Sequence, residues 1–347
     1  MKSKLFISSS SELSKITNET LQNPIENVLV IGLGASVLNS RSLSAFADVT
    51  KNLIFLDSIE QSVIDKTIKH LSKDSTVMVA ISKSGSTDET ILILQYIEKT
   101  PLKNSKLYLV SENPDSLLIS TGKELSSDYK FIEYEKSISG RFSIFLNASL
   151  LPLHLAGADI YKIVDIAKNY NDNLSYQTLA NSLLSHYRKN RNILVLSVYQ
   201  NSLIGFAEWV RQIVAESLGK DNFGLTTLIS RGTIDEHSQL QLYLDGPDDK
   251  IYYLLPFFRE NKGGIDQSLI NHMESFNKAI EERKRPCLYS ILNSKNSLNT
   301  KIEYGINTIC KWLLAIEFIA HQQKINPFDQ PAIEKAKNYF TEKSEIK

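Results

Sequence analysis

Short apolar runs alternate along the chain with longer stretches in which apolar residues recur at helical spacing. The runs occupy residues 27–31, 53–56, 76–81 and 106–110, then 192–197, 225–229, 250–255 and 287–292. Continuous, β-branched runs bounded by polar turns are typical of strands that are buried on both faces. Their alternation with helices predicts β-α-β units. We therefore expect an α/β protein with two doubly wound parallel sheets.

A polar stretch separates the two series of runs. Residues 169–173 read NYNDN, a composition typical of a boundary between packed units. Helical spacing covers about residues 301–324, and Pro331 suits the first turn of another helix. The sequence thus predicts an N-terminal subdomain over residues 1–168, a C-terminal subdomain over 174–300 and a C-terminal helical extension over 301–347.

Charge and cysteine content narrow the function classes. The 347 residues include 39 basic and 39 acidic side chains, so the net charge is zero. A neutral chain has no overall attraction to nucleic acid or to an anionic membrane surface. Apolar runs stay well short of the roughly 18 residues that span a bilayer. Cys287 and Cys310 form no CxxC pair, which favours a reducing compartment, so we expect a soluble cytoplasmic protein.

The turn after the first apolar run could approach a ligand, because ligands of such sheets bind at the carboxyl ends of the strands. Residues 32–36 read GLGAS, which imitates the start of a dinucleotide fingerprint. Val37, however, stands where that fingerprint needs its third glycine. A tight turn without a ligand and a turn that touches a sugar phosphate both remain open. Ala35 suits the second interpretation only if its φ is not positive.

The turn after the third apolar run is more informative. Residues 82–87 read SKSGST and precede a stretch of helical spacing. Hydroxyls, backbone N–H groups and the positive end of a helix suit a phosphate monoester. The order of residues does not match a nucleotide P-loop. The alternative is a serine-rich helix cap with a solvated lysine; phosphate binding accounts better for four hydroxyls and an ammonium around one glycine.

Six segments taken together resemble the glucose-6-phosphate isomerase family of sugar isomerase (SIS) domains. They are GLGAS (32–36), ISKSGSTDET (81–90), SGRFS (139–143), AESLGKD (215–221), HSQLQL (237–242) and NPFDQPAIEKAK (326–337). They stand in the family's order and cover nearly the whole chain. The resemblance implies two flavodoxin-like SIS subdomains. It also implies reversible isomerisation of glucose 6-phosphate and fructose 6-phosphate through a cis-enediol(ate), in glycolysis and gluconeogenesis, without metal or organic cofactor.

The resemblance also assigns roles to individual residues. Glu216, which helical spacing over 203–218 places on the last turn of a helix, matches the base that moves the proton. Arg141 matches the cation that stabilises the enediolate, and His237 and Lys337 match the pair that opens the sugar ring. Because the family's histidine comes from the neighbouring subunit, a homodimer is implied. The residues that match substrate-binding positions are Gly34, Ala35, Ser36, Ser82, Lys83, Ser84, Thr87, Gln212 and Gln330.

Two alternatives remain at this stage. One is a bifunctional phosphoglucose/phosphomannose isomerase with wider tolerance at C2 of the sugar. The other is a non-catalytic SIS protein that binds a sugar phosphate. Such a protein needs residues 82–87 but has no use for Glu216, His237 and Lys337 together, so we favour the enzyme.

Overall fold

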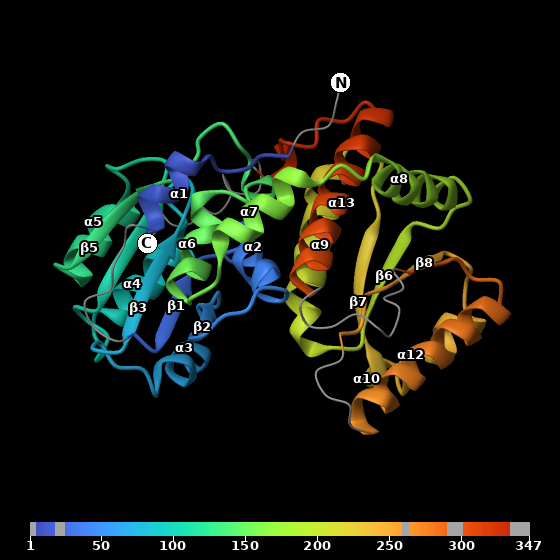
Figure 1. Cartoon of the computed structure of the whole chain (residues 1–347), viewed down its shortest axis with the longest axis horizontal. Helices are drawn as coiled ribbons and strands as arrows, with labels where there is room; N and C mark the ends of the chain where they lie inside the picture. The colour runs from blue at the N-terminus through green and yellow to red at the C-terminus, as the bar shows by residue number, and fades with distance from the viewer. Residues whose placement is uncertain (1–4, 18–24, 259–263, 290–300, 334–347) are drawn as a thin grey trace, which may run out of the picture.

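Two parallel sheets lie side by side in the computed structural model, which describes residues 5–17, 25–258, 264–289 and 301–333 (Figure 1). The first has the order β2-β1-β3-β4-β5, with β1 Asn27–Ile31, β2 Asn52–Leu56, β3 Thr76–Ile81, β4 Lys106–Ser111 and β5 Tyr129–Glu133. The second has the order β7-β6-β8-β9, with β6 Ile193–Val198, β7 Thr226–Arg231, β8 Lys250–Leu254 and β9 Cys287–Tyr289. The predicted fold class is therefore confirmed.

The strands form where apolar runs can be buried on both faces. Every residue of β1 and β3 is buried, and the two strands pair in parallel with Val28 opposite Val77. The predicted runs agree with the observed strands to within a residue or two, and residues 290–292 of the last run lie outside the described residues. The sequence does not predict strand β5, because at this sheet edge only Ile132 is buried and the apolar pattern is weak.

Helices connect the strands and cover both faces of the sheets. They are α1 Ser10–Thr17, α2 Ala35–Ser44, α3 Gln61–Ile68, α4 Asp88–Ile97, α5 Leu117–Leu125, α6 Asn147–Leu155, α7 Ile160–Asn169, α8 Asn173–Tyr187, α9 Ile204–Leu218, α10 Gly232–Glu236, α11 Leu240–Asp245, α12 Gly264–Glu282 and α13 Lys301–Gln322. Two α-helices, α6 and α7, stand between β5 and the polar residues 169–173, and α8 begins within that polar stretch. Gly157, at φ +92°, separates α6 from α7, and the Asp159 and Asp172 side chains cap α7 and α8.

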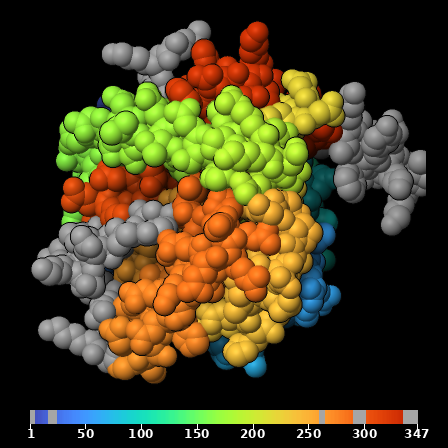
Figure 2. All heavy atoms as spheres, turned by 90° about the vertical axis from the view of Figure 1, so that its right-hand side faces the viewer, coloured from blue at the N-terminus to red at the C-terminus, as the bar shows by residue number. Residues whose placement is uncertain are grey.

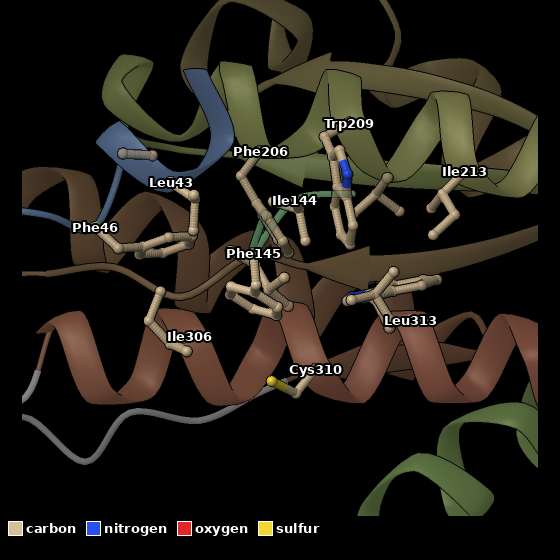
Figure 3. Packing of buried hydrophobic residues seen from close by; sticks show 14 of the residues in the cluster. Leu43, Phe46, Ile144, Phe145, Phe206, Trp209, Ile213, Ile306, Cys310 and Leu313 are labelled. Carbon is tan, nitrogen blue, oxygen red and sulfur yellow. The ribbon is translucent and has the colours of Figure 1, made fainter. Parts of the chain in front are cut away.

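The largest apolar core lies between the sheets and joins them. Helix α9 packs against α2 and against α13, and Figure 3 shows Phe206 and Trp209 of α9 facing Cys310 and Leu313 of α13. Helix α13, predicted as part of a C-terminal extension, is thus a core helix that also contacts α7 and α8. Helix α8 packs against α13 in this core, whereas α12 packs on the opposite face of the second sheet; both are visible on the surface in Figure 2. In the described part of the chain, no helix is long and apolar enough to cross a membrane.

Gly305 of α13 allows the close approach of that helix to Phe46. A Cβ atom at position 305 would lie 2.1 Å from Cγ of Phe46. Alanine normally stabilises a helix interior by about 0.5–1 kcal/mol over glycine. Overpacking of a core costs about 1–3 kcal/mol and should exceed that gain. We therefore expect Gly305→Ala to lower the free energy of unfolding by about 1–2 kcal/mol in urea denaturation.

A double-mutant cycle separates this contact from helix propensity. In a Phe46→Ala background the cost of Gly305→Ala should shrink, because Cγ and Cδ1 of Phe46, the two atoms nearest to the new methyl group, are gone. An equal cost in both backgrounds, or a more stable Gly305→Ala protein, would show that the Phe46 contact does not limit packing here.

Candidate active site

Residues 82–87 form a compact turn of hydroxyls between β3 and α4. The buried Ser82 hydroxyl lies 2.8 Å from the Thr87 hydroxyl and accepts a hydrogen bond from the Gly85 N–H at 3.1 Å. Ser84 and Ser86 are exposed, and their hydroxyls are 3.0 Å apart. Inner hydroxyls therefore fix the turn, while the outer ones face solvent at the start of a helix. This arrangement can bind a phosphate group.

Gly85 is required by the shape of this turn. Its φ is +71°, and a Cβ there would lie 2.2 Å from the Ser116 hydroxyl oxygen. A side chain at this position would have to displace the start of α5 while adopting a left-handed conformation. The turn is thus tied to the neighbouring β4–α5 connection.

The first turn lies against two other parts of the site. Gly34, at φ +57°, precedes α2, and a Cβ there would lie 3.1 Å from Nε2 of Gln212. Ala35 and Ser36 form the first turn of α2, and Ala35 does not have a positive φ, as the phosphate-site interpretation requires. A Cβ on Gly140 would lie 3.2 Å from Cβ of Ala35. Close backbone approach therefore explains why small residues occupy this turn.

Lys83 contacts the loop that precedes Arg141. Its ammonium donates hydrogen bonds to the carbonyls of Lys136 at 2.9 Å and Ile138 at 2.7 Å, and lies 3.8 Å from the Glu112 carboxylate. In this structure Lys83 thus joins the turn of residues 82–87 to the loop that precedes Arg141.

Arg141 lies at the centre of the site. It belongs to a short 3₁₀ helix, Gly140–Phe142, and only 3% of the residue is exposed. Its Nε donates to the Ser217 hydroxyl at 2.9 Å, and its Nη2 donates to the carbonyls of Pro327 at 2.5 Å and Asp329 at 2.8 Å. Burial lowers the pKa of the guanidinium, and the nearby carboxylate of Glu216 opposes that shift. These contacts hold a buried cation in one orientation.

Arg141 also meets Glu216 and Gln330 on the side of the site that is open to solvent. Its Nη1 lies 3.2 Å from Oε2 of Glu216 and 3.3 Å from Oε1 of Gln330. Glu216 stands on the last turn of α9, and its Oε1 accepts a hydrogen bond from Nε2 of Gln212 at 2.9 Å, one turn earlier. A carboxylate oxygen has two lone pairs, so each Glu216 oxygen can still accept a proton.

A cavity of about 630 Å³ opens beside this cluster. It is lined by the end of α9 and the loop that follows, and by residues from the C-terminal segment, including Glu216, Lys220 and Gln330. The cavity is large enough for a sugar phosphate. The Glu216 carboxylate, which contacts the buried Arg141, thus faces a solvent-accessible space.

Comparison with known proteins identifies the family of this chain. The family model described as phosphoglucose isomerase matches residues 14–225. The chain belongs to the phosphoglucose isomerase family. It is 30% identical to the glucose-6-phosphate isomerase of Methanocaldococcus jannaschii, over 91% of this chain and 83% of that protein. It is also 30% identical to a probable glucose-6-phosphate isomerase of Methanococcus maripaludis, over 92% of this chain and 78% of that protein. The family predicted from the six segments is thereby confirmed.

Solved structures support the fold of this phosphoglucose isomerase family member. A hypothetical protein from Thermus thermophilus superposes with a TM-score of 0.75 at 25% identity, over 92% of this chain and 84% of that chain. A glucose-6-phosphate isomerase from Chlamydia trachomatis superposes with a TM-score of 0.70 at 17% identity, over 93% of this chain and 70% of that one. The second likeness concerns the fold alone.

His237 does not join the cluster within one copy of this family member. It directly follows α10, which begins after the carboxyl end of β7, and its side chain is exposed. Glu216 instead precedes β7, at the end of α9, a helix of 15 residues that spans about 22 Å. The two residues therefore lie at opposite ends of the second sheet. Lys337 lies outside the described residues.

Several residues that hold the site together are not assigned by the sequence. Lys220 lies 3.0 Å from the Asp329 carboxylate and donates to the Asn326 carbonyl; its hydrogen bond holds the pKa of Asp329 below its usual range. The buried Asn39 donates to the Gly140 carbonyl at 2.9 Å. Lys220 and Asp329 fall within the segments that revealed the family, whereas nothing in the sequence pattern marks Asn39. Among the described residues, no group of three His, Cys, Asp or Glu side chains could hold a metal ion.

Proposed function

We propose that this chain is a glucose-6-phosphate isomerase that interconverts glucose 6-phosphate and fructose 6-phosphate. The contact between buried Arg141 and Glu216 carries the proposal, because it places a carboxylate base and a fixed cation side by side. The family match and the curated relatives support the same reaction. We place the activity in the cytoplasm, in glycolysis and gluconeogenesis; Cys287 and Cys310 are free thiols, which suits a reducing compartment.

The phosphate group would bind at the two turns of the first sheet. Ser82 and Thr87 hold the turn in place, and Ser84 can donate its hydroxyl hydrogen to a phosphate oxygen. Ser36, on the first turn of α2, offers a second hydroxyl at a helix start. Two helix N-termini favour the negative charge of the ligand. The sugar would then extend toward Gln212 and Glu216.

Isomerisation requires a proton to move between C2 and C1 of the open-chain sugar. We assign this step to the Glu216 carboxylate, which takes the proton from one carbon and returns it to the other. Negative charge develops on the oxygens of the enediolate, and Arg141 already presents its guanidinium beside the carboxylate. Gln212 and Gln330 are placed to hydrogen-bond Glu216, Arg141 or sugar oxygens. Proton transfer and charge stabilisation account for each step, so we propose no cofactor.

Ring opening would use His237 from a second copy of the chain, together with Lys337. Two features of the described residues support this arrangement. His237 and Glu216 lie at opposite ends of the second sheet of one copy. In addition, β7 is an edge strand, and exposed apolar side chains stand on β7 and on the two helices that flank His237 in the sequence: Leu228, Ile234 and Leu242. Such a surface is suited to an interface between copies.

The reaction is tested with the purified chain and fructose 6-phosphate. Glucose 6-phosphate formation is followed through a coupled glucose-6-phosphate dehydrogenase, with mannose 6-phosphate supplied as an alternative substrate. Turnover of fructose 6-phosphate alone is expected. Turnover of mannose 6-phosphate at a similar rate would show the bifunctional enzyme instead. A raised melting temperature without turnover would overturn the proposal and show a sugar-phosphate-binding protein.

Mixing two inactive variants tests the shared site. Glu216→Gln and His237→Asn should each be inactive alone, because each lacks one group in every site. After the two are unfolded and refolded together, half of the dimers are hybrids with one intact site of two. We therefore expect about one quarter of the parent specific activity to return. No recovery, with dimers present in size-exclusion chromatography, would show that His237 acts within its own subunit.

A further inference from the structure

Helix α10, which ends one residue before His237, is held at its first residue by Tyr199. Tyr199 follows β6 and is 8% exposed. A Cβ on Gly232, the first residue of α10, would lie 3.0 Å from Cδ1 and 3.1 Å from Cα of Tyr199. The start of α10 thus rests directly on this tyrosine. Only glycine, at φ +26°, permits so close a contact.

The same tyrosine also holds the last residue of α10. The Tyr199 hydroxyl donates a hydrogen bond to Oε1 of Glu236 at 2.7 Å. The other oxygen of Glu236, Oε2, lies 2.8 Å from Nδ1 of His272, which belongs to α12 on the outer side of the second sheet (Figure 2). Burial and the neighbouring carboxylate both raise the pKa of Tyr199, so it remains a hydrogen-bond donor. Both carboxylate oxygens of Glu236 are therefore engaged.

Tyr199 is itself fixed in the packed interior. Its ring centroid lies 6.4 Å from that of Phe276, in an edge-to-face arrangement, within an apolar cluster formed by β6, β8 and α12. The imidazole of His237, by contrast, makes no hydrogen bond or ion pair with any other residue that the structure describes. The position of that imidazole thus depends on the backbone of α10, and Tyr199 and Glu236 determine the position of that backbone.

We infer that Tyr199 and Glu236 are positioning residues that hold the His237 imidazole in the position and orientation needed to open the sugar ring. The inference rests on the proposed function, in which His237 exchanges a proton with the ring oxygen. A hydrogen bond between a buried tyrosine and a carboxylate fixes geometry without touching the substrate. Loss of the hydrogen bond between Tyr199 and Glu236 should slow ring opening and leave proton transfer at Glu216 unchanged.

Interconversion of the α and β anomers of glucose 6-phosphate isolates ring opening, since the ring must open and close again. We would measure this exchange by NMR magnetisation transfer in a Glu216→Gln background, where isomerisation is blocked. Adding Tyr199→Phe removes one hydroxyl and keeps the ring on Gly232 and Phe276. The enzyme-catalysed exchange rate should fall about tenfold. This loss is a part of the roughly 10²–10⁴-fold rate enhancement that general acid–base catalysis supplies.

Tyr252→Phe is the matched control. Tyr252 is fully buried in the same cluster, and its hydroxyl donates to the Tyr243 carbonyl at 3.2 Å, away from α10. Tyr252→Phe in the Glu216→Gln background should exchange the anomers as fast as Glu216→Gln alone. Glu236→Gln provides a second test if Tyr199→Phe does not fold, as judged by its melting temperature.

The outcomes separate the inference from the proposed function. If the Glu216→Gln protein exchanges anomers no faster than buffer, ring opening by this chain fails, and the proposed function fails at that step. If that protein exchanges anomers and folded Tyr199→Phe or Glu236→Gln does so equally fast, the proposed function stands and the positioning role is wrong. A rate that falls in both variants and holds in Tyr252→Phe supports the inference.

Discussion

Replacing Glu216 by glutamine should lower kcat for fructose 6-phosphate by about 10³-fold, because the amide cannot accept the proton from the sugar carbon. Glutamine has the same shape: its side-chain oxygen can accept from Arg141, and its NH2 can donate to Gln212 once that amide turns its own oxygen inward, so the melting temperature should change little. The phosphate group would bind at residues 82–87, so KM should stay within about threefold of the parent value. Coupled steady-state kinetics measures both constants.

Glu208 offers a matched control on the same helix. It lies two turns before Glu216, its side chain is 25% exposed like that of Glu216, and it pairs with Arg41 at 3.3 Å. Glu208→Gln should retain the parent kcat. Exchange of the substrate C2 proton in D₂O should stop in Glu216→Gln and persist in Glu208→Gln. Exchange that persists in both would assign the base to another residue.

Replacing Arg141 by lysine should also lower kcat strongly, by about 10²-fold. Lysine keeps one positive charge but cannot donate at once to Ser217, Glu216 and the two carbonyls of the C-terminal segment. Enediolate stabilisation should weaken, since removing one donor to a developing oxyanion costs about 10²–10³ in kcat. The loss should appear in kcat/KM and in kcat together, as measured by the coupled assay.

Loosening of the C-terminal segment could by itself reduce activity, and Asp329→Asn controls for it. That change removes the ion pair with Lys220 but leaves the Asp329 carbonyl to accept from Arg141. We expect Asp329→Asn to lower the melting temperature slightly and to keep most of kcat. If it loses as much kcat as Arg141→Lys, then placement of the segment, and not the guanidinium charge, limits the reaction.

Much of the fold could be predicted from the sequence because local patterns dictate it. Apolar β-branched runs such as 27–31 and 76–81 can only be buried as central parallel strands, and the structure confirms them. The pattern does not mark β5, an edge strand whose outward side chains need no apolar partner. Nor does it show that α13 packs between the sheets, since an apolar helix could equally cover an outer face.

The candidate site likewise has parts that can be predicted from the sequence and parts that cannot. A short motif such as 82–87 can be recognised from its composition alone. The partners of Arg141 cannot, because the Pro327 and Asp329 carbonyls are backbone groups that any residue type could supply. The contacts of Lys83 with the 136 and 138 carbonyls are hidden for the same reason. The division into subdomains and the role of Lys337 stay predictions.

The carbonyls that hold Arg141 have a consequence for biosynthesis. Asp329 lies 188 residues after Arg141, so the guanidinium emerges from the ribosome long before the groups that bury it. At 5–20 residues per second, the interval is about 10–40 s. The first sheet can form during this time, but its central cation remains solvated and the pocket stays unfinished. Nascent chains that stop before residue 327 should therefore fold in part without becoming competent for catalysis.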